Sequence, residues 1–98
     1  MRFKEGIKVL KSLSVSEKDF KQIQRVLRHT KYFKFENGKT TRISADTAIS
    51  ILGENAFWSG VSRSAFHWSA ERRADAGTHI LFDSSAFFTN KTEGGTIT

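Results

Sequence analysis

The side chains that could carry out acid–base chemistry are few in this 98-residue chain and far apart in its sequence. His29, His67 and His79 could in principle supply a pair of imidazoles for metal-free ribonuclease chemistry, but nothing in their spacing predicts a shared site. His67 and Glu71 stand four residues apart and could offer two metal ligands, yet no third ligand is apparent and the chain has no cysteine. We therefore expect a non-catalytic protein without a metal or cofactor.

Residues 56–68, which read AFWSGVSRSAFHW, carry the pattern most suggestive of function. The small side chain of Ala56 would let two helices pack closely, and Gly60 would adopt a left-handed conformation between them. Val61 would then pack into the core, and Ser62 would cap a second helix. This segment resembles the turn and second helix of a helix-turn-helix DNA-binding motif. The resemblance implies that three polar residues face base edges: Arg63, Ser64 and His67.

The same stretch is also compatible with one amphipathic helix from Asn55 to Arg73. One buried row would then hold Phe57, Val61, Ala65 and Trp68, and the adjacent row Trp58, Ser62 and Phe66. Under either interpretation Arg63, His67 and Glu71 share one helix face, as a solvated stripe or as a contact surface. Gly60 separates the two interpretations, because only the first needs a break there.

The charge of the chain favours a polyanionic partner. Sixteen Lys and Arg against ten Asp and Glu give a net charge of +6, which attracts nucleic acids. We predict a small basic protein that binds DNA or RNA, as a regulator. The candidate contact residues are Arg25, Arg28, Lys34, Lys39, Arg42, Arg63, Ser64, His67, Arg72 and Arg73.

A protein partner is the alternative prediction. A short, basic, aromatic-rich chain of this kind could be an inhibitor or adaptor such as phage and plasmid genes encode. Exposure of Trp58, Phe66 or Trp68 would favour that alternative, because aromatic and Arg residues dominate protein hot spots. A contiguous basic stripe would favour nucleic acid instead, and scattered charge around an aromatic patch would favour a protein.

The clearest local signal is a β-hairpin over residues 32–43. Asn37 and Gly38 tolerate the positive φ angles of a two-residue type I′ turn. The expected register pairs Glu36 with Lys39 and Phe33 with Arg42. Phe33 and Phe35 then share one face, which we expect to be core, although such a face bordered by Lys34, Lys39 and Arg42 could also stack unpaired bases.

Helical patterns flank the hairpin. A first helix is predicted over 3–13, with Phe3, Ile7, Leu10 and Leu13 inside. Residues 14–17 are expected to form a break and a new N-cap, and a second helix to run from there to about His29, with Phe20, Ile23 and Leu27 inside. A third follows the N-cap Ser44 and ends at Gly53. Thr78–Asp83 is a predicted strand, and residues 86–88 are its possible short return.

These elements predict an α+β fold of order α-α-β-β-α-α-β, with a small antiparallel sheet packed on helices. The single domain is expected to span residues 1–89, and residues 90–98 to form a disordered tail. The expected core residues are Phe20, Leu27, Phe35, Leu52, Phe57, Trp68 and Phe82.

The sequence predicts a cytoplasmic protein that does not associate with membranes. No apolar stretch approaches the roughly 18–20 residues that cross a bilayer. The first residues also lack the apolar run and the small-residue cleavage site of a signal peptide.

Overall fold

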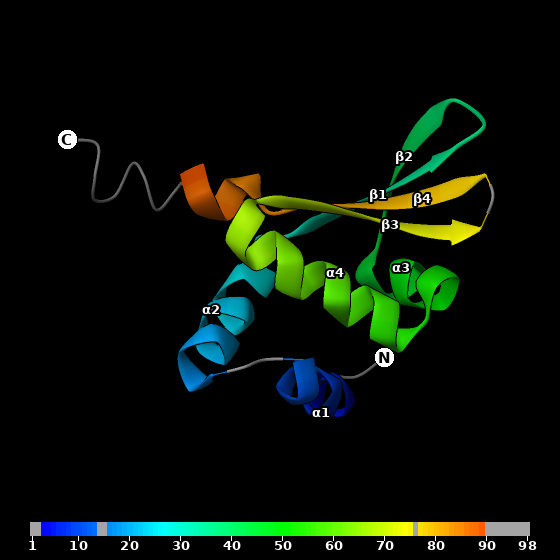
Figure 1. Ribbon diagram of the computed structural model, residues 1–98. Coiled ribbons are helices and arrows are strands. Elements are labelled where there is room, and N and C mark those ends of the chain that lie inside the picture. The colour runs from blue at the N-terminus through cyan, green and yellow to red at the C-terminus, as the bar shows by residue number, and fades with distance from the viewer. Residues whose placement is uncertain (1–2, 14–15, 76, 90–98) are drawn as a thin grey trace.

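The computed structural model describes residues 3–13, 16–75 and 77–89, without the side chains of residues 3–5 and 7. The elements form two layers, with a four-stranded antiparallel sheet on one side and the helices on the other (Figure 1). In chain order they are α1 (Phe3–Leu13), α2 (Glu17–Leu27), β1 (Lys31–Glu36), β2 (Lys39–Ile43), α3 (Ala45–Leu52), α4 (Glu54–His67), β3 (Ser69–Asp75) and β4 (Thr78–Asp83). A short helix over residues 85–89 follows.

The α+β class and the antiparallel sheet are confirmed, but the predicted order of elements is incomplete. The strands lie in the order β2-β1-β4-β3, and β3 occupies residues that we expected to continue a helix. Ala70 of β3 is buried against the helices while its neighbour Glu71 is exposed, so the segment alternates with the period of a strand. Residues 86–88 are helical and do not form a return strand.

The hairpin forms in the predicted register, but its buried face is the one opposite to the face expected from the sequence. Asn37 and Gly38 have φ angles of 51° and 75°, and Phe33 pairs with Arg42 as expected. Tyr32 turns toward the helices and is buried, whereas Phe35 on the other face is 47% exposed. The prediction of Phe35 as core is therefore wrong. Aromatic residues occupy both alternating positions of β1, so its hydrophobic pattern does not distinguish the inner face from the outer one.

Helices α2 and α3 begin at serine N-caps. The side-chain oxygens of Ser16 and Ser44 accept hydrogen bonds from the backbone N–H groups three residues later, and Gly53, at φ 90°, ends α3. Leu10 is buried, but Leu13 is 41% exposed, so the predicted inner stripe of α1 stops before its last turn. The side chains of Phe3 and Ile7, and the expected tail over residues 90–98, lie outside what the structure describes.

Helix α4 runs without interruption through Gly60, so the turn required by a helix-turn-helix is not formed there. A Cβ atom at position 60 would stand 2.5 Å from Cε1 and 2.9 Å from Cδ1 of Phe82. Gly60 is needed because the helix lies this close to β4, and not because the chain turns. The helix ends at His67, and Trp68 follows at φ 54° with its side chain exposed, contrary to its expected place in the core.

The core is an aromatic cluster where β1, β4 and α4 meet. Phe57 and Phe82 are buried as predicted, and their ring centroids lie 5.6 Å apart. The Tyr32 ring packs against both, with its centroid 5.4 Å from that of Phe57 and 5.7 Å from that of Phe82. Three further predicted core residues are partly buried and pack on this cluster: Phe20, Leu27 and Leu52.

Tyr32 makes the stability of the fold sensitive to alkaline pH. Burial raises the pKa of Tyr32 from 10.0 to about 12. The folded protein then holds this proton more tightly than the unfolded chain does, so the stabilisation is complete below pH 10 and is lost as the pH rises toward 12. Between pH 10 and 12, the free energy of unfolding measured in urea should fall by about 2–3 kcal/mol because Tyr32 ionises, at about 1.4 kcal/mol per pKa unit. Tyr32→Phe should remove that part of the pH dependence, and an unchanged dependence in the variant would contradict the assignment.

Candidate nucleic-acid interface

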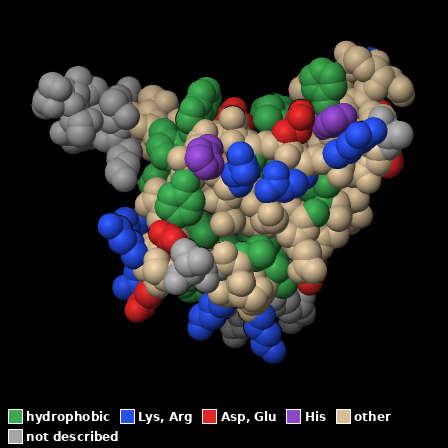
Figure 2. Space-filling model, viewed as in Figure 1, with side chains coloured by type: hydrophobic (Ala, Val, Ile, Leu, Met, Phe, Trp, Pro, Cys, Tyr) green, Lys and Arg blue, Asp and Glu red, His purple; other side chains and the backbone are tan. Residues whose placement is uncertain are grey.

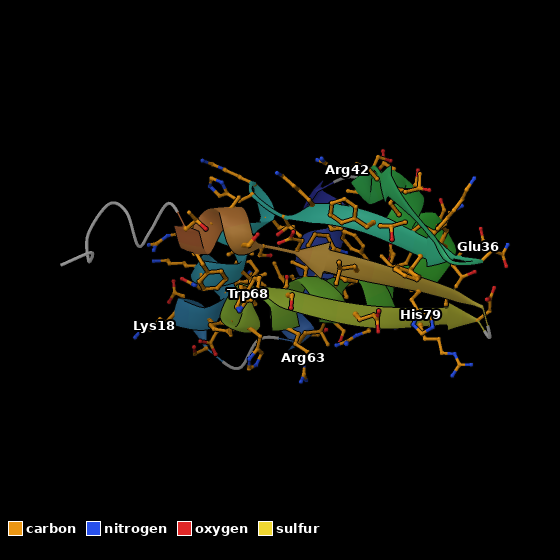
Figure 3. The ribbon with its side chains drawn as sticks, turned by 90° about the horizontal axis from the view of Figure 1, so that it is seen from above. Lys18, Glu36, Arg42, Arg63, Trp68 and His79 are labelled. Atoms are coloured by element: carbon orange, nitrogen blue, oxygen red, sulfur yellow. The ribbon has the colours of Figure 1, made fainter. Side chains whose placement is uncertain are left out.

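One face of the sheet is left uncovered by the described helices. In each strand, alternate residues turn toward the helices, as Ile80 and Phe82 do in β4, and the intervening ones turn away. We call the residues that turn away the open sheet face, and Figure 3 looks down onto it. At its centre and edges it comprises Phe33, Phe35, Thr40, Arg42, Glu71, Arg73, His79 and Leu81.

Strand pairing arranges these side chains in two rows across the sheet. One row runs Arg42, Phe33, Leu81, Glu71, and the other runs Thr40, Phe35, His79, Arg73. Neighbouring strands lie about 4.8 Å apart, and alternate residues of one strand about 7 Å apart. Phe33 and Phe35 are thus adjacent rings on the central strand β1, with Leu81 and His79 beside them on β4.

Each row has an arginine at one end, and the two arginines lie at opposite edges of the sheet. The guanidinium of Arg42, on edge strand β2, lies 5.7 Å from the centroid of the Phe33 ring, within cation–π range. Arg73, on edge strand β3, donates from Nε to the backbone oxygen of Asp75 at 3.2 Å. The two rings therefore lie between one arginine at each edge of the sheet.

The open sheet face also carries the acidic side chain of Glu71, and Asp75 lies beyond it on the same strand. Glu71 Oε1 lies 3.6 Å from Nδ1 of His79 on the neighbouring strand. The backbone N–H of Gly77 donates to Asp75 Oδ1 at 3.0 Å and lowers the pKa of Asp75, and the positive charge of Arg73 lowers it further. Asp75 is therefore ionised at neutral pH, in the turn beyond the two rows.

The basic residues predicted from the sequence do not form one stripe. Arg42 and Arg73 lie on the open sheet face, whereas Lys34 and Lys39 alternate onto the other side of the hairpin, where Lys34 Nζ lies 3.4 Å from Glu36. Arg25 belongs to α2 in the helical layer, and Arg28 is the C-cap residue of that helix. Figure 2 shows a further group of basic side chains along the line where α4 and β3 run, and Figure 3 places Arg63 at that margin.

Two of the predicted contact residues have structural roles. Ser64 is completely buried; it donates to the backbone oxygen of Val61 at 3.1 Å and accepts from Ser84 at 3.0 Å. The Ser64 side chain therefore does not face outward, although the resemblance to a helix-turn-helix motif implied that it would. Arg72 turns inward from β3 and donates to Ser59 Oγ at 3.0 Å, which ties the edge strand to α4.

The sequence interpretation missed the contribution of β4 to the open sheet face. His79 and Leu81 alternate with the fully buried Ile80 and Phe82, and this period-two pattern was the available signal. The pattern alone does not show which residues lie beside His79 and Leu81, because the sequence does not identify the partner strands of β4. Pairing with β1 places His79 and Leu81 next to the two phenylalanines.

Comparison with protein-family models, with curated proteins and with solved structures returned no match. Within residues 3–13, 16–75 and 77–89, no helix is long and apolar enough to cross a membrane. The same residues contain no group of three or more side chains placed to hold a metal ion.

Proposed function

We propose that this protein binds single-stranded nucleic acid on its open sheet face and acts as a non-catalytic regulator. The observation that carries the proposal is the pair of outward-facing phenylalanines on the central strand, of which Phe35 is 47% exposed. Neighbouring apolar side chains that form a contiguous exposed patch mark interaction sites, whereas single exposed ones do not.

Unpaired bases are the partner that fits this surface. Every base has a flat π face, so stacking on phenylalanine tolerates any sequence and contributes about 1–3 kcal/mol per base. Rings about 7 Å apart along a strand suit successive bases that are splayed out of a helix. Bases in a duplex keep their faces stacked on one another, so this mode favours single strands.

The charges of the molecule support the same proposal. The net charge of +6 attracts a polyanion from solution. Arg42 and Arg73 then stand at opposite edges of the aromatic rows, where a strand that crosses the sheet would bring its phosphates.

A salt titration tests this proposal. The affinity for fluorescent oligothymidylate and oligouridylate, measured by anisotropy, should fall linearly with the logarithm of the salt concentration. Arg42→Gln and Arg73→Gln should each reduce the slope of that line by about one. The matched control is Arg25→Gln on α2, in the helical layer, which should leave the slope unchanged.

Two results would contradict the proposal. One is the absence of binding to either oligonucleotide at roughly 50 mM salt, where phosphate contacts are strong. The other is tighter binding to duplex DNA than to single strands, with Arg63→Gln and not Arg42→Gln changing the slope. That result would place the interface on α4.

A second candidate function, binding to another protein, is supported by the scattered arrangement of the basic residues and by the exposed aromatic side chain of Trp68. Its side chain is 58% exposed, and its φ of 54° is a conformation that costs a bulky residue about 1–2 kcal/mol. Phe66 nearby is 46% exposed. Aromatic side chains of this kind anchor protein interfaces. If this function is the correct one, Trp68→Ala should abolish association with the partner while Phe35→Ala leaves it intact.

A further inference from the structure

The helical layer contains a pocket that the proposed function does not use. It has a volume of about 780 Å³ and lies between α2 and α3, with residues of β1 and α4 completing its lining. Both helices pack on α4 and leave this space between them. Its apolar surface comes from Leu27, Tyr32, Ala45, Ile49, Phe57 and Trp58.

The periodicity of α2 gives one side of this pocket three basic residues, and Asp46 of α3 is the one acidic residue in the lining. Lys21, Arg25 and Arg28 are spaced four and three residues apart, so they follow one face of the helix and all contribute to the lining. The Nζ of Lys21 lies 3.8 Å from Glu17, one turn earlier in the helix. In the part of the chain that the structure describes, no acidic group forms an ion pair with Arg25 or Arg28.

Tyr32 adds a hydrogen-bond donor to the lining. Its side chain is almost fully buried and forms part of the pocket lining. Burial raises the pKa of Tyr32 to about 12, so the hydroxyl keeps its proton at neutral pH. The group can therefore donate to an acceptor that enters the pocket.

We propose that the pocket between α2 and α3 binds a small organic anion with a flat aromatic body. The aromatic body would lie against Ile49, Phe57 and Trp58, and the anionic group would meet the guanidinium groups of Arg25 and Arg28.

The size and the chemistry of the pocket agree with this class of ligand. Its volume falls within the roughly 300–1,000 Å³ of known small-molecule pockets, which combine apolar walls with a few polar groups. Guanidinium groups bind carboxylate, sulfonate or phosphate oxygens in a bidentate manner and also stack on aromatic rings. The Trp58 ring packs edge-on against Phe57, with centroids 5.2 Å apart, so the walls themselves are aromatic.

The test uses two dyes that differ in charge. Anilinonaphthalene sulfonate carries an aromatic body and one anionic group, and phenylnaphthylamine is its neutral counterpart. The chain has two tryptophans, so the Trp68→Phe variant leaves Trp58 as the single reporter inside the pocket. In that protein we expect energy transfer from Trp58 to the sulfonate dye, and weaker binding of the neutral dye.

Two further changes locate the site. Replacing both arginines, Arg25→Gln with Arg28→Gln, should lower the affinity for the sulfonate dye by about tenfold or more and leave the neutral dye unaffected. Both residues are exposed, so the fold should tolerate the change. Ile49→Trp should fill the pocket and reduce the binding of both dyes. Phe35→Ala, on the open sheet face, is the control and should change neither affinity.

The proposal is overturned if the double arginine variant binds the sulfonate dye as tightly as the parent does. It is also overturned if Phe35→Ala abolishes dye binding, because the dye would then be on the sheet. Neither result bears on oligonucleotide binding, which is measured separately, so the pocket and the proposed function can fail independently.

Discussion

Replacing Phe33 and Phe35 together by alanine is expected to lower the affinity for single-stranded oligonucleotides by roughly 30-fold or more. Each ring should contribute about 1–3 kcal/mol through stacking on one base. The fold should survive the change, because Phe35 is half-exposed and both rings lie outside the aromatic core. The slope of affinity against salt should stay the same, since the arginines that meet the phosphates are unchanged.

Phe66→Ala is the matched control for this pair. Phe66 is an exposed phenylalanine of similar accessibility that belongs to α4 and not to the sheet. Its replacement should leave oligonucleotide affinity within about twofold, a difference of less than 0.5 kcal/mol. A variant without Phe33 and Phe35 that binds as well as the parent protein would disprove stacking on the open sheet face.

The second large effect concerns the contact between Gly60 and Phe82. Phe82→Ala should destabilise the fold by about 3–5 kcal/mol, because the ring is fully buried between Tyr32 and Phe57. Gly60→Ala should cost about 1–3 kcal/mol, although alanine is the better helix former, because the new methyl group overlaps the same ring. Chemical denaturation measures both changes.

A double-mutant cycle separates overlap from other causes. With Phe82 removed, the methyl group of Gly60→Ala has space, so the double variant should lose less stability than the sum of the two single variants. Additive losses would mean that the two positions do not interact. A stabilising Gly60→Ala would mean that α4 lies further from β4 than the structure indicates.

Local features of the fold could be predicted from the sequence. The hairpin register follows from Asn37 and Gly38, whose tolerance of positive φ determines the turn. The starts of α2 and α3 follow from Ser16 and Ser44, whose side chains cap the backbone a few residues away. Each of these signals depends only on neighbours in the sequence.

Features that depend on distant partners could not be predicted in this way. Residues 69–75 carry a pattern compatible with a helix, and they form β3 because β4 offers them an open edge. The orientation of β1 depends on whether Tyr32 or Phe35 fits between Phe57 and Phe82, and those residues lie more than twenty positions later.

The candidate site shows the same division between local and distant information. Composition predicted a basic, aromatic protein, whereas Phe33 and Phe35 were expected in the core and base stacking beside Arg42 was only the alternative. Helical spacing could not show that Ser64 is buried in a network with Ser84, twenty residues further along the chain. It also could not show that Arg72 turns inward while Arg73 turns outward, because that depends on the strand pairing of β3.

The most direct test of the central claim is a nuclear magnetic resonance titration with oligothymidylate. If single strands stack on the open sheet face, the ring protons of Phe33 and Phe35 and the methyl groups of Leu81 should show the largest shifts. Resonances of Trp68 and of α2 should change little, because these residues are not on that face. Shifts confined to Trp68, Phe66 or α2, with the two phenylalanine rings unperturbed, would contradict the account.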